Sequence, residues 1–405
     1  MEKQKEANER QERLGLYAET IPYLLQWYDY NRRILPWRED PTPYHVWVSE
    51  IMLQQTRVEA VKGYYDRFLT RLPDVAALAA AEEEELLKLW EGLGYYNRVR
   101  NMQKAAQVIM GEYGGEMPAD YEKLRALPGV GDYTAGAISS IAFGLPYPAV
   151  DGNVLRVMSR IACSEEDIAK EQTKRKLKED LTSVMSARSG DFNQSLMELG
   201  AMVCLPNGKP LCEQCPVMHL CKAFHAERET ELPIKSGKKE RRIEKRVVYL
   251  VFCDGKVLLH RREKKGLLAG LWEFPNVLTE EAGKKLRKVT PATVAEELCT
   301  EFAKERDAGT EKPKLTVKKA KKAKHIFSHV EWHMEGVRIE AQTAEGGLGG
   351  HLLEVMKRVC ETKGAEEESN NWVFVTPQEL EEKYPMPSAF EVYYKEVCDE
   401  NRNRL

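Results

Sequence analysis

The feature of this sequence that most constrains its fold is a glycine-rich turn, LPGVG, at residues 127–131. Gly129 and Gly131 stand where a backbone must turn sharply, and a run of small, mostly apolar residues follows at 134–138. The stretch therefore predicts two short helices joined by a hairpin. Such a turn presents successive backbone N–H groups at a helix N-terminus, where they can bind a phosphate without reading a base. A plain turn between helices is the alternative.

Two acidic residues stand in contexts that suit chemistry. Asp151 follows the hairpin within VDGNV, so it should face whatever the hairpin binds. Glu50 lies in an expected helix among Trp47, Val48 and Ile51. Burial raises the pKa of a carboxyl group and keeps a proton available near neutrality, as a general acid requires. A half-exposed helix residue is the alternative for Glu50.

Four of the nine cysteines are crowded into one short segment. They stand as Cys204-x7-Cys212-x2-Cys215-x5-Cys221. This pattern favours a metal site in a reducing compartment over a disulfide scaffold. Four thiolates suit either an iron–sulfur cluster or zinc, and the spacing does not choose between them.

The periodicity of the chain changes near its middle. Helical spacing of apolar residues prevails at 8–225, and a basic stretch follows at 226–245. Strands are then expected at 246–253 and 256–262, joined by a hairpin turn at Asp254-Gly255. We therefore expect an all-α domain at 8–225, a basic linker at 226–245 and an α+β domain at 246–400.

Composition limits the partners of the chain. Its 405 residues carry 61 Lys and Arg against 64 Asp and Glu, a net charge of −3. Any affinity for nucleic acid must therefore come from local patches. The sequence shows no apolar run of membrane-spanning length and no signal-peptide pattern at its charged start, which predicts a soluble, intracellular protein without a membrane partner.

With this hairpin, trailing aspartate and cysteine group, the chain resembles the helix-hairpin-helix DNA glycosylases, and within them the adenine DNA glycosylases of the MutY kind. The discriminating position is Tyr133. Relatives of the endonuclease III type have a lysine in this position, and its amine attacks the sugar. Tyrosine has no amine, so the resemblance implies a monofunctional N-glycosylase.

The resemblance also implies roles for residues that match the family's motifs. The catalytic group comprises Glu50 as general acid, Asp151 as stabiliser of the sugar cation, and Tyr133 and Asn153 as residues that orient Asp151. The base pocket comprises Arg33, Leu35, Trp37 and Gln194, whose amide can pair bidentately with adenine. The residues implied to contact DNA or the lesion are Leu53, Gln55, Tyr95, Gly129, Val130, Gly131, Phe327, Ser328 and His329.

The family carries one 4Fe-4S cluster on cysteines spaced x6, x2 and x5, and the first gap here is one residue longer. The implied substrate is duplex DNA with an adenine opposite 8-oxoguanine or guanine, and the product an abasic site of base excision repair. A monomer is expected, cytoplasmic or nucleoid-associated in a bacterium, and nuclear or mitochondrial in a eukaryote.

The second domain resembles the Nudix fold, on the strand pair and on GLWEFP at 270–275. A working Nudix hydrolase needs a dense acid set for magnesium, but the segment at 293–298 keeps only Glu296 and Glu297. A nucleotide pyrophosphatase is thus disfavoured. A DNA-binding scaffold would not need both Glu50 and Asp151. A thymine-excising glycosylase is the nearer alternative, against which Gln194 and the second domain argue.

Overall fold

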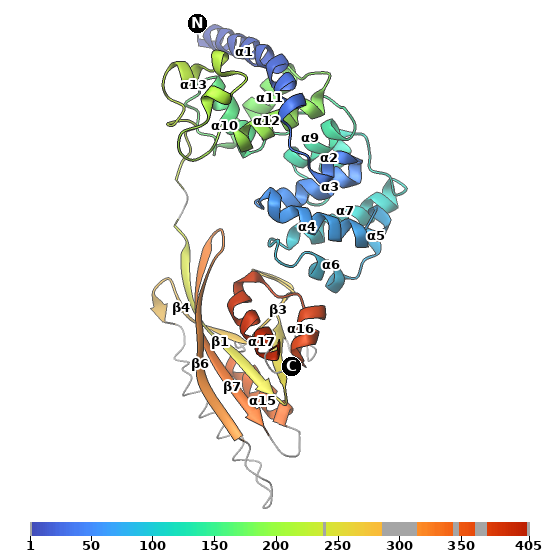
Figure 1. Cartoon of the computed structure of the whole chain (residues 1–405), viewed down its shortest axis with the longest axis vertical. Helices are drawn as coiled ribbons and strands as arrows, with labels where there is room; N and C mark the ends of the chain where they lie inside the picture. Colours follow the sequence, from blue (N-terminus) through green and yellow to red (C-terminus); the bar gives the residue numbers. More distant parts are fainter. Residues whose placement is uncertain (1, 238–239, 286–313, 343–347, 361–370, 403–405) are drawn as a thin grey trace, which may run out of the picture. The chain divides into compact units, whose positions relative to one another are not determined.

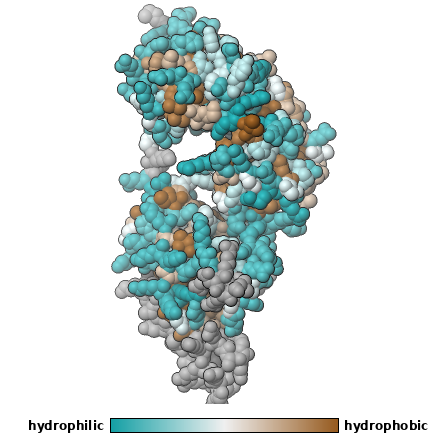
Figure 2. Space-filling view, viewed as in Figure 1, coloured by the Kyte–Doolittle hydropathy of each residue, from teal (hydrophilic) through white to brown (hydrophobic). Residues whose placement is uncertain are grey.

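The computed structural model describes residues 2–237, 240–285, 314–342, 348–360 and 371–402 (Figure 1). The chain forms two compact units. The first combines Met1–Ala81 with Asn97–Lys238, and the second combines Glu82–Tyr96 with Lys239–Leu405. Hydrophilic side chains cover much of the face shown in Figure 2. None of the described helices is long and apolar enough to cross a membrane.

The described part of the first unit is helical. Its α-helices are α1 Glu2–Asn31, α2 Pro36–Glu39, α3 Pro43–Leu53, α4 Val58–Arg71, α5 Val75–Ala80, α7 Asn97–Glu112, α8 Tyr121–Ala126, α9 Asp132–Ile141, α10 Gly152–Ile161, α11 Glu171–Ser183, α12 Ser189–Met202 and α13 Lys222–His225. Short 3-10 turns occur at η1 Cys212–Gln214 and η2 Met218–Leu220. The all-α prediction for this part of the chain is confirmed.

The first helix, α1, begins before residue 8, where the helical domain was expected to start. The helix is continuous from Glu2, because two arginines fix it to a distant residue. Arg10 Nε donates to Asp180 Oδ1 at 2.9 Å, and Arg13 Nε donates to Oδ2 at 2.7 Å. Asp180 is only 1% exposed, so these bonds compensate a buried charge.

The predicted hairpin lies between α8 and α9. Gly129 adopts φ +76°, a left-handed conformation that glycine accepts without strain. On α9, a Cβ added to Gly136 would overlap the carbonyl oxygen of Pro148. Glycine at this position therefore lets α9 pack directly against the segment that leads to Asp151.

The second unit is built on one mixed sheet. Its strands are β1 Arg242–Cys253, β2 Lys256–Arg261, β3 Trp272–Glu273, β4 Asn276–Glu281, β5 Lys284–Lys285, β6 Lys314–Ile326, β7 Val330–Gln342 and β8 Trp372–Val375. The main path runs β3-β2-β1-β4-β5, while β7 pairs with β1 in parallel and with β6 antiparallel, and β8 pairs with β2. Its helical segments are α6 Glu83–Leu89, α15 Leu348–Cys360, α16 Pro377–Lys383, η4 Ser388–Phe390 and α17 Glu391–Arg402.

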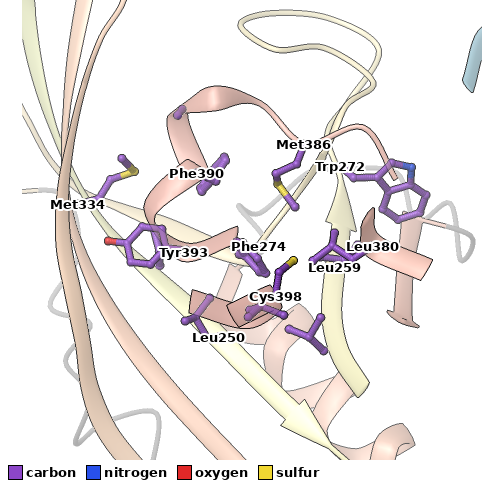
Figure 3. Close-up of a cluster of buried hydrophobic side chains, with 14 of the residues drawn as sticks. Leu250, Leu259, Trp272, Phe274, Met334, Leu380, Met386, Phe390, Tyr393 and Cys398 are labelled. Carbon is purple, nitrogen blue, oxygen red and sulfur yellow. The ribbon is translucent and has the colours of Figure 1, made fainter. Parts of the chain in front are cut away.

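Both faces of the sheet are buried, because β1 alternates between two hydrophobic clusters. Val248 and Leu250 face the cluster shown in Figure 3, where Phe274, Phe390 and Tyr393 lie with side chains of α16 and α17. Tyr249 faces the other cluster, with α15. This layered arrangement confirms an α+β fold.

The predicted turn between β1 and β2 is confirmed, since Asp254 and Gly255 both have positive φ, +49° and +77°. The strand itself starts earlier than expected. Arg242 to Lys245, predicted as linker, pair with β4 and β7. Glu244 is buried here and bonded to Arg242 and Arg246, which makes these charged residues part of the sheet. The acid-poor segment at 293–298 lies outside the described residues.

Candidate active site

A cavity of about 1450 Å³ in the helical unit collects most of the predicted site residues. Its lining is contributed by α2, α3, α9, α11 and α12, by the hairpin, and by the segment around Asp151. The predicted residues that line it are Arg33, Leu35, Trp37, Glu50, Leu53, Gln55, Gly129, Gly131, Tyr133, Asp151, Asn153 and Gln194. Residues far apart in the sequence therefore share one site.

Glu50 lies on α3, which Thr42 caps by accepting from the backbone N–H of His45. The side chain is only 6% exposed. Burial raises the pKa of Glu50 to about 7, and the nearby charge of Asp151 acts in the same direction, while a hydrogen bond from Tyr133 and the charge of Arg38 act against it. Glu50 can therefore hold a proton near neutral pH.

Tyr133 contacts a different carboxylate from the one expected. The sequence analysis assigned it to Asp151, but its hydroxyl donates to Glu50 Oε2 at 2.5 Å. Tyr133 is the second residue of α9, so the hairpin turn determines where its side chain lies. The hairpin and the predicted acid are thus joined by one hydrogen bond.

Asp151 is the N-cap of α10, a role that fixes both of its oxygens. Oδ1 accepts from the backbone N–H of Val154 at 2.7 Å, and Oδ2 accepts from Asn153 Nδ2 at 2.8 Å. Burial raises the pKa of Asp151, and these hydrogen bonds act against that rise. Asn153 is oriented in turn, because its Oδ1 accepts from Arg156 at 2.9 Å.

Gly200 packs against Asn153. A Cβ added to this α12 residue would lie 2.6 Å from the Cβ of Asn153, closer than two carbons can approach. The position of Asn153, and through it that of Asp151, therefore depends on a glycine in a neighbouring helix.

The predicted base pocket combines apolar walls with a charged network. Leu35 and Trp37 are buried. Arg33 binds Glu198 with both Nε, at 2.9 Å, and Nη2, at 2.6 Å. Arg38 also binds Glu198, at 3.0 Å, and its Nε donates to Gln194 Oε1 at 2.9 Å.

Arg38 and Glu198 were missed by the sequence analysis. Two signals were available: Arg38 directly follows Trp37, and Glu198 stands four residues after Gln194, on the same face of α12.

The hairpin end of the cavity carries mixed charge. Gly129 and Gly131 line it, whereas Val130 is buried and does not. Asp132, at the start of α9, accepts from Lys178 at 2.9 Å and from Arg125 at 3.0 Å. Sequence reasoning did not assign α11 to the site, yet its Lys174, Arg175 and Lys178 line the cavity.

Leu53, the last residue of α3, and Gln55, just beyond the helix, both line the cavity, and Gln55 adopts φ +60°. Arg98 Nη1 donates to the carbonyl oxygens of Ile51 at 2.6 Å and Gln54 at 2.7 Å. This contact, which the sequence did not reveal, caps the helix that carries Glu50. Tyr95 does not line the cavity and belongs to the other unit, where it is 48% exposed.

The four cysteines line a second, small cavity of about 30 Å³ with apolar walls. Within the described residues, no three His, Cys, Asp or Glu side chains converge closely enough to hold a single metal ion. Arg160 Nη1 donates to Cys204 Sγ at 3.1 Å, which would help to compensate a thiolate charge. All four predicted ligands, including Cys204 after its longer gap, therefore share one site.

The predicted lesion-reading residues lie in the second unit, in the turn between β6 and β7. The backbone N–H of Phe327 donates to Val330 at 2.8 Å, which leaves Ser328 and His329 exposed at the tip. The Phe327 ring packs edge-on against Trp332, with centroids 4.9 Å apart.

Comparison with protein families agrees with this arrangement. The model of the HhH-GPD superfamily of base excision DNA repair proteins matches residues 48–182, and the NUDIX domain model matches residues 246–396. In solved structures, a thermostable thymine-DNA glycosylase is 28% identical, with a TM-score of 0.48, over 53% of this chain and 98% of that one. The helical fold with its hairpin and the HhH-GPD match together indicate a base excision DNA repair protein of the helix-hairpin-helix class.

Relatives narrow the class further. Adenine DNA glycosylase of Homo sapiens is 37% identical over an alignment of 377 residues, and the match covers 79% of this chain and 67% of the human protein. The Mus musculus enzyme is 37% identical over 76% of this chain and 68% of its own length. The Arabidopsis thaliana enzyme is 40% identical over 65% of this chain and 48% of its own length. The chain belongs to the adenine DNA glycosylase family.

Proposed function

We propose that this protein hydrolyses the N-glycosidic bond of adenine mispaired with 8-oxoguanine or guanine in duplex DNA and leaves an abasic site. The observation that carries the proposal is the pairing of Glu50, buried and able to hold a proton near neutral pH, with Asp151 in the lining of one cavity. Adenine must leave the base stack to reach such groups, and the cavity of about 1450 Å³ has room for a flipped nucleotide.

The mechanism uses the two carboxyl groups differently. Glu50 donates its proton to adenine N7, so that the base leaves as a neutral molecule with the electrons of the broken C1′–N9 bond. Asp151, ionised and held by Asn153 and its own helix, stabilises the positive charge that develops on the sugar. Water then adds to C1′ and loses a proton to one of the carboxylates. Tyr133 offers no amine, so no covalent attachment to the sugar is expected.

The hairpin turn at Gly129 and Gly131 would bind a phosphate of the same strand through its backbone N–H groups. Leu53, Gln55 and Tyr95 would fill or support the space that the flipped adenine leaves. Lys174, Arg175 and Lys178 on α11 add positive charge beside the hairpin and would contact the backbone further along. Binding would therefore depend strongly on salt, although the chain has a net charge of −3.

Cys204, Cys212, Cys215 and Cys221 would hold one 4Fe-4S cluster. A zinc ion needs four sulfurs within about 4 Å of one another, whereas each cysteine of such a cluster binds a different iron. The four cysteines line one small cavity with apolar walls, which suits such a cluster. The cluster would brace the loop after α12, since glycosidic hydrolysis requires no electron transfer. Iron near four atoms per chain in the purified protein tests this, and stoichiometric zinc without iron would reject it.

Phe327, Ser328 and His329 would read 8-oxoguanine opposite the target. Replacing Ser328 and His329 by alanine should lower the preference for A:8-oxoguanine over A:G, since each lost base contact costs about 1 to 3 kcal/mol of discrimination. The excision rate on A:G should stay close to wild type. A single-turnover comparison of the two duplexes decides the matter, because equal losses on both would assign the loop a structural role.

We further propose two working domains at 8–225 and 246–400, with the basic stretch at 226–245 between them as a linker along DNA. The boundary between the two compact units, at Lys238, falls inside this stretch, whereas residues 82–96 of the proposed first domain group with the second unit. We expect the protein to act as a monomer. A DNA substrate implies a compartment that holds DNA: the cytoplasm or nucleoid of a bacterium, or the nucleus or mitochondria of a eukaryote.

The direct test incubates the purified protein with a duplex containing one A:8-oxoguanine pair and reveals abasic sites with alkali. Strand breaks at the adenine are expected only after alkali. A matched T:G duplex is the control for the thymine-excising alternative, and a free nucleoside triphosphate is the control for the Nudix alternative. Activity on either control without activity on adenine would overturn the proposal.

A further inference from the structure

A glutamine is an ambiguous reader of bases. Its amide has an acceptor oxygen on one side and a donor NH2 on the other, and rotation by 180° exchanges them. In one orientation it matches adenine, which presents the N6 amine beside a ring nitrogen acceptor. In the other it matches guanine on its N1 edge, where O6 accepts and N1–H donates. Something besides Gln194 must therefore select adenine.

Arg38 supplies that selection in this structure. Its Nε lies 2.9 Å from Gln194 Oε1. A guanidinium group carries only donors, so the amide oxygen must face it, and a flipped amide would place donor against donor. Among the described residues, no acceptor for Gln194 Nε2 is found, which leaves that donor available to the cavity that Gln194 lines.

Glu198 holds Arg38 in this position. Its carboxylate is 1% exposed and accepts from Arg38 at 3.0 Å and from Arg33 at 2.6 Å. Arg38 Nη1 also donates to the carbonyl oxygen of Arg33 at 3.1 Å. With its fork bound on this side, the guanidinium of Arg38 has little freedom to turn away from Gln194.

We propose that Arg38, positioned by Glu198, determines base specificity by fixing the amide of Gln194 with its oxygen and nitrogen in the adenine-matching order. Oε1 keeps one lone pair for the N6 amine, and Nε2 donates to N1, because N7 takes the proton of Glu50. A base with an oxygen at position 6 would bring two acceptors together. The inference rests on the proposed function and adds positioning residues to it.

The test uses hypoxanthine, which has the size of adenine but carries O6 and N1–H. Single-turnover excision of adenine and of hypoxanthine, each opposite 8-oxoguanine, is measured with the full chain. Wild type should favour adenine by on the order of 10- to 100-fold. If wild type excises adenine but treats both bases alike, the inference fails. If it excises no adenine, the proposed function itself fails.

Two substitutions separate polarity from packing. Arg38→Gln introduces a side chain that can accept as well as donate, so Gln194 can flip and the preference should fall by about tenfold or more. Arg38→Lys keeps a donor-only group and should retain the preference within about threefold. Arg32→Gln, at an exposed neighbour outside the cavity lining, is the control.

Equal loss of preference in Arg38→Gln and Arg38→Lys would show a merely structural role and overturn the inference. Thermal unfolding of each variant shows whether it is folded. Should Arg38→Gln not fold, the wild-type ratio and the Arg38→Lys ratio still decide, because a low preference in either contradicts the proposal.

Discussion

Two parts of the cavity lining each contain a buried glutamate, and their surroundings shift the two pKa values in opposite directions. Burial raises the pKa of Glu50 to about 7. Burial acts in the same direction on Glu198, but hydrogen bonds and charge from Arg33 and Arg38 bring its pKa below the ordinary value. The side chains are 6% and 1% exposed, so burial does not distinguish them. The hydrogen-bond partners determine the direction of the shift. With a tyrosine as partner the pKa of Glu50 stays raised, whereas two arginines lower the pKa of Glu198.

The largest expected effect on activity comes from removing the proton of Glu50. Glu50→Gln fills the same volume but cannot protonate a base, so single-turnover excision should fall by about 10² to 10⁴-fold. Duplex binding, measured by gel shift or anisotropy, should change only a few-fold. Glu59→Gln, at a residue of α4 outside the cavity lining, should leave excision unchanged. Excision by Glu50→Gln within a few-fold of wild type would reject Glu50 as the acid.

The same substitution at Glu198 should act on stability. Glu198→Gln leaves Arg33 and Arg38 without a buried counter-charge, which costs about 3 kcal/mol of unfolding free energy at pH 7. Since the pKa of Glu198 is lowered in the folded state, its contribution is present at neutral pH and is lost as the pH falls through the lowered pKa. The difference in unfolding free energy between variant and wild type, measured with urea, should therefore become smaller at acid pH. A gap that is small at pH 7 would contradict the paired-charge account.

In the same urea-unfolding measurement, Glu50→Gln should raise the unfolding free energy instead of lowering it. The pKa of Glu50 is raised from 4.5 to about 7 on folding, so the wild type loses stability as the pH rises through that range. The variant avoids this loss and should be more stable than wild type by up to about 3 kcal/mol at pH 8, with little difference below pH 4.5. Urea unfolding at several pH values checks it, and equal curves at pH 8 would mean that Glu50 ionises without cost.

The smallest expected effect is a shift in the pH dependence of excision when Tyr133, the partner of Glu50, loses its hydroxyl. Tyr133 donates a hydrogen bond that lowers the pKa of Glu50, so Tyr133→Phe should raise it. The excision rate of the wild type should fall above pH 7. In the variant, this alkaline limb of the pH–rate profile should lie about one pH unit higher. Subsaturating enzyme makes the profile report the free protein. A limb that moves downward would show that Tyr133 does not stabilise the carboxylate.

Local patterns predicted the fold well because they arise from near neighbours in the chain. The hairpin at 127–131 and the turn at Asp254-Gly255 require only a few residues of particular conformational freedom. The start of α1 was missed for the opposite reason. Its helix is fixed by Asp180, some 170 positions from Arg10, and no local signal reports that contact.

The site residues also divide into those that local motifs predicted and those that depend on distant contacts. Glu50, Asp151 and Asn153 were found from motifs, and the structure brings all of them to the cavity lining. The partner of Tyr133 was misassigned, since sequence gives a residue's neighbours but not the direction of its side chain. Arg38 and Glu198 were overlooked because their contact joins residues 160 positions apart.

Gly200 carries a consequence for reading genetic variation in this gene. Gly200→Ala adds one methyl group, removes no charge and touches no reacting atom, and scales of amino-acid similarity rank such a change as mild. Yet the added carbon would fall 2.6 Å from Asn153 Cβ and displace the amide that holds Asp151. A missense change at this glycine should therefore be classed with changes at Asp151 itself, although the protein would keep every residue to which a catalytic role is proposed.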